Sequence, residues 1–315
     1  MKAIVAALVL FACTPLQGAW LRGNLHTHTL ESDGDSKPAE VVRWYAEHGY
    51  DFLVLTDHDK VTRVEDAAGI VLIPGEEVTD RLPKKPLHVN AIGIEEAVQP
   101  QHGATVVEVL QHDIDAVRKA GALALINHPN FGWAFGADEL LQLEHANFLE
   151  IASGHRYVNA EGPPSVESMW DRMLTAGKLI YGVAVDDMHH LQRVWDDDVV
   201  PPGRAWVVVR AEKRDAQSIL GALERGDFYA STGVELIDIV TTPKSIEVSV
   251  REKNLAHYRI QFIGNAGRML QETVGTTATY AIRGSEGYVR AKVLDSNGKA
   301  AWTQPVMVMV KGKGK

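Results

Sequence analysis

The strongest constraint on the fold is a repeated pair of features: a short, largely apolar run followed at once by a polar cluster rich in histidine and acidic residues. The pairs stand at 52–55 with 56–59, 70–73 with 74–77, 122–126 with 127–130, 148–151 with 152–156, and 179–185 with 186–190. Apolar runs of this length are typical of strands buried on both faces. Because the carboxyl ends of parallel strands meet at one edge, we expect the polar clusters to form a single site.

Helical patterns separate these runs. Apolar residues share one face in the stretches 38–48, 105–120 and 165–176, and the first begins with a capping serine and an early proline, Ser36 and Pro38. Alternating strands and amphipathic helices indicate parallel βα units, which is the pattern of a barrel. One predicted strand, 87–93, breaks the pattern because its histidine, His88, stands near its start.

An earlier polar cluster contains two alternating histidines, His26 and His28, with Asp33 in the following glycine-containing turn. In an extended backbone alternate side chains share a face, so both imidazoles can reach one metal ion. Alternating histidines also occur on exposed strands, and this stretch alone leaves that interpretation open. The clusters that follow the later strands favour a metal site.

The periodicity of the apolar residues changes at about Val234. From there apolar residues alternate with period two, helical patterns are absent, and an Asn-Gly turn stands at 297–298. We therefore predict a barrel over 19–233, a small antiparallel accessory β domain over 234–310, and a disordered tail over 311–315.

The first 18 residues resemble an export signal, with Lys2 before an apolar run from 3 to 12. The single cysteine, Cys13, closes that run and resembles a bacterial lipoprotein cleavage site, whereas ordinary cleavage near Gly18 or Ala19 and a buried N-terminal helix are alternatives. We expect an exported protein, periplasmic or lipid-anchored, with membrane contact only through Cys13 and no disulfide.

The overall charge limits the class of molecule that the protein is expected to bind. The net charge of −9 argues against a nucleic-acid backbone, so we expect a small-molecule ester as the substrate and no nucleic-acid partner. The sequence gives no indication of the oligomeric state.

Taken in order, the polar clusters resemble the motifs of the PHP (polymerase and histidinol phosphatase) metallohydrolases. The matching residues lie between about 20 and 229 and are His26-x-His28 with Asp33, Thr56-Asp57-His58, Gly75-Glu76-Glu77, His88, His128-Pro129 and Asp187-Met188-His189. Within that superfamily, the stretches 127–133, 181–187 and 229–234 resemble the CehA/McbA branch of exported hydrolases.

The resemblance implies a distorted (β/α)7 barrel with a site for two to three divalent ions, usually zinc, manganese or iron. It implies three ligand sets: His26, His28, Glu77 and Asp187; Glu77, His88 and His128; and Asp33, His58 and His189. Glu77 would bridge two ions and is preferred to Glu76 because the family motif is glycine, any residue, glutamate. Asp187 and His189 fit the family's Asp-x-His better than Asp186 and His190.

The types of the candidate ligands indicate metal chemistry independently of the family resemblance. Mixed imidazole and carboxylate sites suit zinc, manganese and iron(II), and adjacent ions activate water as hydroxide while they clamp the oxygens of the attacked group. We expect Glu77, Asp187 and His189 to act in catalysis.

Four residues around the expected metal site each have two possible roles. His155 and Arg156 are candidates for contacting a substrate anion, and Asp57 and Asp59 for orienting ligand histidines. A plain surface or loop role is equally open for these four. The acidic run at 196–198 is interpreted as a solvated loop.

The predicted function is a metal-dependent hydrolase, and within that class a phosphoesterase acting on a small phosphate mono- or diester. A carbamate or carboxyl ester hydrolase on the same site is the alternative reaction. A non-catalytic PHP module is the alternative of another class, and the nine filled ligand positions together with the export signal favour the enzyme.

Overall fold

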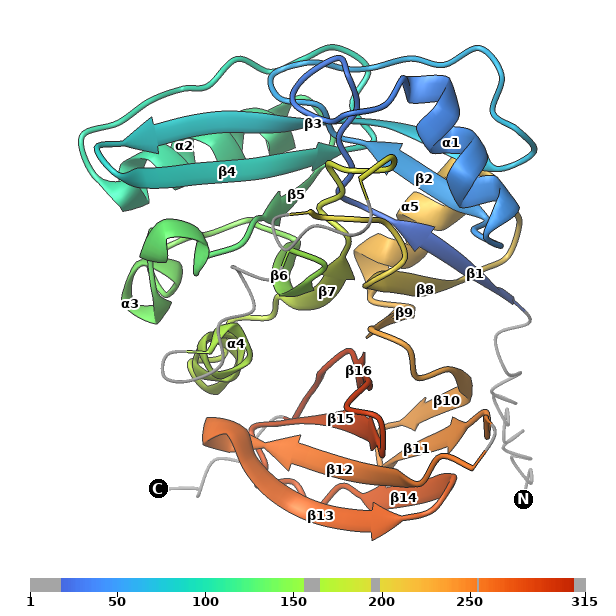
Figure 1. Cartoon of the computed structure of the whole chain (residues 1–315). Helices are drawn as coiled ribbons and strands as arrows, with labels where there is room; N and C mark the ends of the chain where they lie inside the picture. The colour runs from blue at the N-terminus through green and yellow to red at the C-terminus, as the bar shows by residue number, and fades with distance from the viewer. Residues whose placement is uncertain (1–17, 156–164, 194–198, 254, 309–315) are drawn as a thin grey trace, which may run out of the picture.

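The computed structural model describes residues 18–155, 165–193, 199–253 and 255–308 (Figure 1). The predicted export segment with Cys13, the candidate Arg156, the acidic run at 196–198 and the tail at 311–315 lie outside the described residues.

The first part of the chain alternates strands and helices, as the sequence predicts. Its strands are β1 (Ala19–Asn24), β2 (Phe52–Leu55), β3 (Val71–Leu82), β4 (Lys85–Ile92), β5 (Leu123–Ile126), β6 (Phe148–Ser153), β7 (Tyr181–Val185), β8 (Trp206–Ala211) and β9 (Phe228–Ser231). Its helices are α1 (Pro38–Glu47), α2 (Val106–Lys119), η1 (Phe131–Trp133), α3 (Ala137–Leu140), α4 (Val166–Thr175) and α5 (Ala216–Arg225).

The second part consists of strands joined by short connections. They are β10 (Leu236–Thr242), β11 (Ser245–Val250), β12 (Tyr258–Gly264), β13 (Arg268–Val274), β14 (Thr277–Ala281), β15 (Tyr288–Asp295), β16 (Ala300–Thr303) and β17 (Val306–Met307), with one short helix, η2 (Asn265–Gly267). Their pairing is antiparallel throughout, as the period-two pattern predicts.

Most strands join one sheet in the order β13-β12-β15-β16-β9-β8-β1-β2-β3-β4-β5-β6-β7, while β10, β11 and β14 form a second sheet. The C-terminal strands lie below the first part in Figure 1, and β16 connects them to it by pairing with β9. The prediction of a mixed α/β protein with an additional β region is therefore confirmed. The domain boundary at 234 stays a prediction.

The prediction of a closed barrel is wrong. β1 pairs with β2 on one edge and antiparallel with β8 on the other, from Ala19 opposite Ala211 to Gly23 opposite Val207, so neither edge is free for β7. The chain segments that follow β1 and β7 meet beyond the strands, where Thr27 forms an isolated parallel β-bridge with Met188. The strand order is thus open, but the chain segments after β1 and β7 still touch.

Strand β4 runs against both of its neighbours, β3 and β5, which corrects the expectation of parallel strands throughout. It forms a hairpin with β3 in which Thr79 lies opposite His88. Because β4 is reversed, its start lies at the edge where β3 carries Glu77. The histidine that breaks the sequence pattern therefore points to the same site as the others.

The interior that supports this edge is apolar. Side chains such as Phe52, Val54, Phe148 and Val183 from several strands pack with Leu223 of α5 and are essentially inaccessible to water. Helix α2 begins with a capping box in which the Thr105 hydroxyl accepts from the Glu108 amide, and its apolar face packs on β4 and β5. Among the described residues, no helix has the length and apolar character needed to cross a membrane.

Candidate functional site

All nine side chains predicted as metal ligands lie together at the ends of the strands. They form four overlapping groups, and within each group one nitrogen or oxygen atom of every residue lies within 4.8 Å of those of the others. We call the whole set the histidine cluster: His26, His28, Asp33, His58, Glu77, His88, His128, Asp187 and His189. These residues come from six separate chain segments, so only the tertiary structure brings them together.

The deepest part of the cluster is formed by the two alternating histidines and two carboxylates. The Nε2 atoms of His26 and His28 are 3.1 Å apart. Glu77 Oε2 lies 3.2 and 3.1 Å from these nitrogens, and Asp187 Oδ1 lies 3.2 and 3.4 Å from them. Four donor atoms of four buried side chains thus converge.

The second carboxylate oxygen of Glu77 faces a different pair of histidines. Glu77 Oε1 lies 2.8 Å from His88 Nδ1 and 3.3 Å from His128 Nε2, and it accepts a hydrogen bond of 2.7 Å from Asn127. Oε2 therefore contacts His26 and His28, with His58 Nδ1 also at 3.3 Å, whereas Oε1 contacts His88 and His128. This is the geometry that a bridging carboxylate requires.

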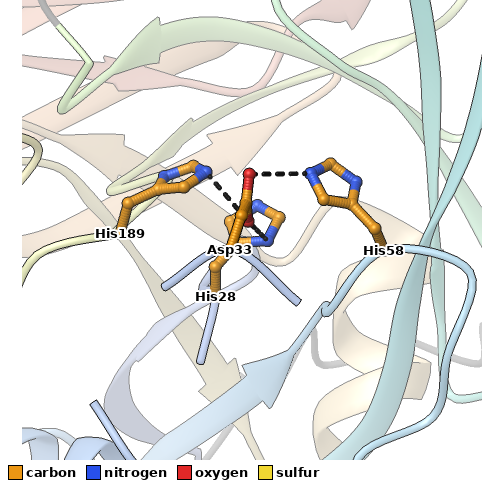
Figure 2. A group of neighbouring side chains, drawn as sticks. All are labelled: His28, Asp33, His58 and His189. Atoms are coloured by element: carbon orange, nitrogen blue, oxygen red, sulfur yellow. Dashed lines mark ion pairs between the residues drawn. The ribbon is translucent and has the colours of Figure 1, made fainter. Parts of the chain in front are cut away.

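The third group is centred on Asp33, with His28, His58 and His189 around it (Figure 2). It is the most open to solvent, since the Asp33 side chain is 53% exposed. The Asp33 carboxylate lies 3.4 Å from His28 Nδ1, from His58 Nε2 and from His189 Nε2. A tight turn holds Asp33 in place. A Cβ on Gly34 would come within 2.8 Å of the Thr29 backbone, so the turn needs glycine there.

The ring orientation of two histidines follows from their hydrogen bonds. His58 Nδ1 lies 2.6 Å from the Thr79 hydroxyl, which itself donates to the Glu77 carbonyl and so accepts from the imidazole. His189 Nδ1 donates to the Asp187 carbonyl at 2.8 Å. In both rings the proton is assigned to Nδ1, which leaves the Nε2 lone pair directed at Asp33.

The ionised carboxylates of the cluster favour positively charged groups beside them, either protonated imidazoles or bound cations. Burial opposes ionisation, yet the Asp187 and Glu77 carboxylates raise the pKa of His28 to about 9. Burial also opposes the charge of Glu77 and Asp187, but the neighbouring histidines, His26 foremost, hold the pKa of both carboxyls well below the usual range. Carboxylates held ionised in a buried site attract cations.

Three neighbouring residues point away from the cluster, in agreement with the chosen register. Glu76 accepts from the Val98 amide, and burial raises its pKa to about 7. Asp186 accepts from the Tyr45 hydroxyl and from the backbone amides of 203, 204 and 205. His190 Nδ1 accepts from the Val200 amide. Glu77, Asp187 and His189 are the members of each pair that face the histidines.

The donor atoms fit divalent metal ions. Metal–ligand bonds of about 2.0–2.2 Å place neighbouring ligands of one ion about 3–3.5 Å apart, which matches the spacing in the deepest group. The mixture of imidazole nitrogen and carboxylate oxygen suits zinc, manganese and iron(II). The cluster therefore matches metal chemistry in both spacing and ligand type.

Sequence reasoning missed Glu150, which is buried in β6. Its Oε2 accepts from the His128 amide at 2.6 Å, and its Oε1 lies 3.6 Å from His26 Nδ1. The sequence contained an indication of this role, because Glu150 is a charged residue inside the apolar run 148–151, and a buried charge needs partners.

The residues assigned provisional roles around the site have mixed outcomes. Asp57 contacts no imidazole within the described ranges; it accepts from the Thr29 amide and from the hydroxyls of Thr29, Ser32 and Thr62, and so fixes the turn that carries Asp33. Asp59 likewise accepts from the Thr79 amide. His155 lies at the rim, with its ring centre 5.6 Å from that of Phe131.

Comparison with known proteins adds three likenesses. No family model matches the chain. A 3',5'-nucleoside bisphosphate phosphatase from Chromobacterium violaceum is 30% identical over 105 residues, which cover 31% of this chain and 36% of that protein's length. An uncharacterized protein from Methanocaldococcus jannaschii is 29% identical over 161 residues, which cover 44% of this chain and 72% of that protein.

The third likeness is structural. A two-domain protein from Bacteroides vulgatus, described as containing a predicted PHP-like metal-dependent phosphoesterase, aligns with a TM-score of 0.52 at 18% identity. The alignment covers 92% of this chain and 96% of that one. At this level of identity the likeness shows a shared fold, and it extends over both parts of the molecule.

Proposed function

We propose that this chain, whose fold resembles that of a protein containing a PHP-like phosphoesterase, is a metal-dependent phosphoesterase that hydrolyses a small phosphate mono- or diester. The observation that carries the proposal is the position of Glu77. Its two carboxylate oxygens face separate groups of histidines, as a ligand shared by two ions requires. Membership of the CehA/McbA branch stays a prediction.

The proposed ligand sets are those that the family resemblance implies, and the contacts within the histidine cluster support them. Asp187 with the two alternating histidines would hold one ion, His88 with His128 a second, and Asp33 with His58 and His189 a third, Glu77 being shared by the first two. Bound ions would supply Lewis acidity to the attacked ester and lower the pKa of water in the site.

Several residues of the chain orient this donor set. Thr79 accepts from His58 Nδ1, so the ring presents Nε2 to the site. Glu150 holds the His128 backbone and faces His26, which limits the movement of both rings. Asp57 anchors the turn before Asp33. Fixed ligands lower the cost of arranging the site at the moment of reaction.

A phosphate ester fits this site better than a neutral ester does. Divalent ions would make the pocket positive although the protein carries a net charge of −9, and a phosphoryl group offers several anionic oxygens to such a pocket. The name of the Chromobacterium violaceum relative, a bisphosphate phosphatase, supports the same choice. His155 at the rim and Arg156 are the proposed contacts for the substrate.

The test combines metal analysis with hydrolysis assays on purified protein. We expect zinc, manganese or iron to co-purify, and turnover of p-nitrophenyl phosphate or bis-p-nitrophenyl phosphate to exceed that of a 1-naphthyl carbamate. Glu77→Gln keeps the shape of the side chain but removes its charge, and should lower kcat/KM by about 100-fold or more together with metal content. Glu76→Gln is the matched control, because Glu76 faces the Val98 amide instead of the cluster.

Each other outcome selects an alternative. Efficient carbamate or carboxyl ester hydrolysis without phosphoester turnover would replace the proposed substrate class. Bound metal without turnover of any ester would favour a non-catalytic module. A larger loss at Glu76 than at Glu77 would contradict the proposed ligand set.

A further inference from the structure

A cavity of about 430 Å³ lies beside β1 and the end of α1, and none of the nine residues of the histidine cluster lines it. Four of its lining side chains are basic, Arg22, His48, Arg204 and Lys299, and no acidic side chain of the described residues lines it. In a protein with a net charge of −9, such a concentration of basic groups is a local reversal of charge. We call this the basic cavity.

Arg22 forms the inner wall of the basic cavity. Its guanidinium carbon lies 3.7 Å from the centre of the Trp206 ring and 4.0 Å from that of Tyr50, and Nη2 donates to the Tyr50 hydroxyl at 2.9 Å. The Nε atom is buried and has no hydrogen-bond partner among the described residues. The nearby Asp51 carboxylate accepts from the Arg22 backbone amide and pairs with Arg214, so it does not neutralise the guanidinium.

Two further cations reach the cavity from distant segments. Arg204 belongs to the loop before β8 and Lys299 to the turn before β16, and neither forms an ion pair with another described residue. Their backbones are fixed, because the Arg204 amide donates to Asp186 and the Lys299 amide donates to Asp295. The positive groups therefore stand on an ordered frame and form no ion pair with a carboxylate of the described residues.

One wall of the cavity is flat and aromatic. The rings of Trp44 and His48 stack with centres 3.7 Å apart and planes 11° apart. Gly203 has a positive φ of 79°, and a Cβ there would lie 3.1 Å from the Trp44 ring. Glycine thus lets the loop approach the indole closely, and the loop and the ring together define the shape of the cavity.

We propose that the basic cavity binds a small oxyanion that carries a planar ring, such as an aryl phosphate, sulfonate or carboxylate. The unpaired cations supply charge-assisted hydrogen bonds to the oxyanion, and the aromatic wall supplies stacking for the ring. The volume lies within the range of about 300–1,000 Å³ that is usual for small-molecule sites. This site is separate from the histidine cluster and does not depend on the proposed hydrolysis.

The test is isothermal titration of the metal-loaded protein with 1-naphthalenesulfonate, which has the charge and the ring but no ester bond to hydrolyse. We expect saturable binding to the wild-type protein, and at least tenfold weaker binding to the Arg204→Gln/Lys299→Gln variant. A matched control, Lys244→Gln/Arg259→Gln, removes the same charge from exposed positions outside the cavity and should bind as the wild type does. Arg204→Lys should retain most of the affinity, which guards against a folding defect.

Two further measurements separate the charge from the ring. The neutral 1-naphthalenesulfonamide should bind at least tenfold more weakly than the sulfonate. Trp44→Leu should weaken sulfonate binding but leave binding of inorganic sulfate unchanged. The proposal is overturned if the wild type binds no sulfonate, if the Arg204→Gln/Lys299→Gln variant matches it, or if the sulfonamide binds equally well.

Discussion

Two buried polar regions of this protein contrast in how their charges balance. One is the histidine cluster. The other, which we call the Arg290 network, lies between α4 and β15 and consists of Glu167, Asp171, Tyr288, Arg290 and Lys292. Arg290 donates from Nε and Nη2 to Asp171 at 2.8 Å and from Nη2 to Glu167 at 2.9 Å, while Lys292 donates to Glu167 at 2.6 Å. Two cations thus meet two carboxylates.

The histidine cluster has no lysine or arginine partner. Its carboxylates Asp33, Glu77 and Asp187 face imidazoles, and no lysine or arginine of the described chain forms an ion pair with them. An imidazole can exchange its proton for a metal ion and a guanidinium cannot, so a region of carboxylates and imidazoles is suited to binding metal, whereas a region balanced by arginine and lysine contributes to the fold. The difference in charge partners therefore assigns the histidine cluster to function and the Arg290 network to stability.

The largest expected effect is on stability, at the Arg290 network. Arg290→Met leaves Asp171 buried without its cation, and should lower the free energy of unfolding by about 3–5 kcal/mol. Denaturant unfolding measures it, with the exposed Arg259→Met as the control. Bound metal should stay unchanged. A loss below about 1 kcal/mol would mean that the network behaves like an exposed surface pair, and the contrast would fail.

The second prediction concerns metal removal. A ligand that binds only the folded state at a free concentration of about 100 times its Kd stabilises it by about 2.7 kcal/mol. Chelation should therefore lower the melting temperature and abolish turnover, and added manganese or zinc should restore both. The stabilisation by metal should be equal in the wild type and in Arg290→Met. Identical melting with and without metal would remove the functional assignment of the cluster.

The third prediction tests the positioning role of Glu150. Glu150→Gln keeps an acceptor for the His128 amide but loses the charge beside His26, so metal affinity should fall by about 10- to 100-fold. Competition with a metal indicator measures the affinity. Glu144→Gln, at an exposed position, is the control. Unchanged affinity would show that Glu150 serves the fold alone.

The smallest expected effect involves Asp113, a buried carboxyl on α2 outside both regions. Burial foremost, together with the charge of Asp80, raises the pKa of Asp113 to about 7, although the Gln101 amide donates to it. The folded state therefore holds a proton that the unfolded state has lost above about pH 4, and stability should fall as pH rises towards 7. The slope for one proton is at most about 1.4 kcal/mol per pH unit.

Asp113→Asn should flatten this dependence. Unfolding curves at pH 5 and pH 8 should differ less for the variant than for the wild type, while Asp115→Asn on the exposed side of α2 should leave the difference unchanged. An unchanged slope in Asp113→Asn would show that the carboxyl is ionised in the folded protein across this range.

Much of the site was predictable because its chemistry is local in sequence. His26 and His28 alternate on one extended segment, and Asp187 and His189 stand two residues apart, so each pair is defined by backbone geometry close to the residue itself. Glu150 was missed because its role depends on His128, which belongs to a different strand. The positions of the strands were equally predictable, because continuous apolar runs are typical of buried strands.

The sequence by itself identified the residues that the structure brings together in the histidine cluster, the positions of most strands and helices, and the antiparallel pattern of the C-terminal part. The tertiary structure decided the rest: the reversal of β4 that brings His88 to the site, the pairing of β8 with β1 that leaves the sheet open, and the contact of Arg290 with Asp171, 119 residues away. The physical reason is that apolar periodicity depends on near neighbours along the chain, whereas strand direction and the partner of a buried charge depend on long-range contacts between segments.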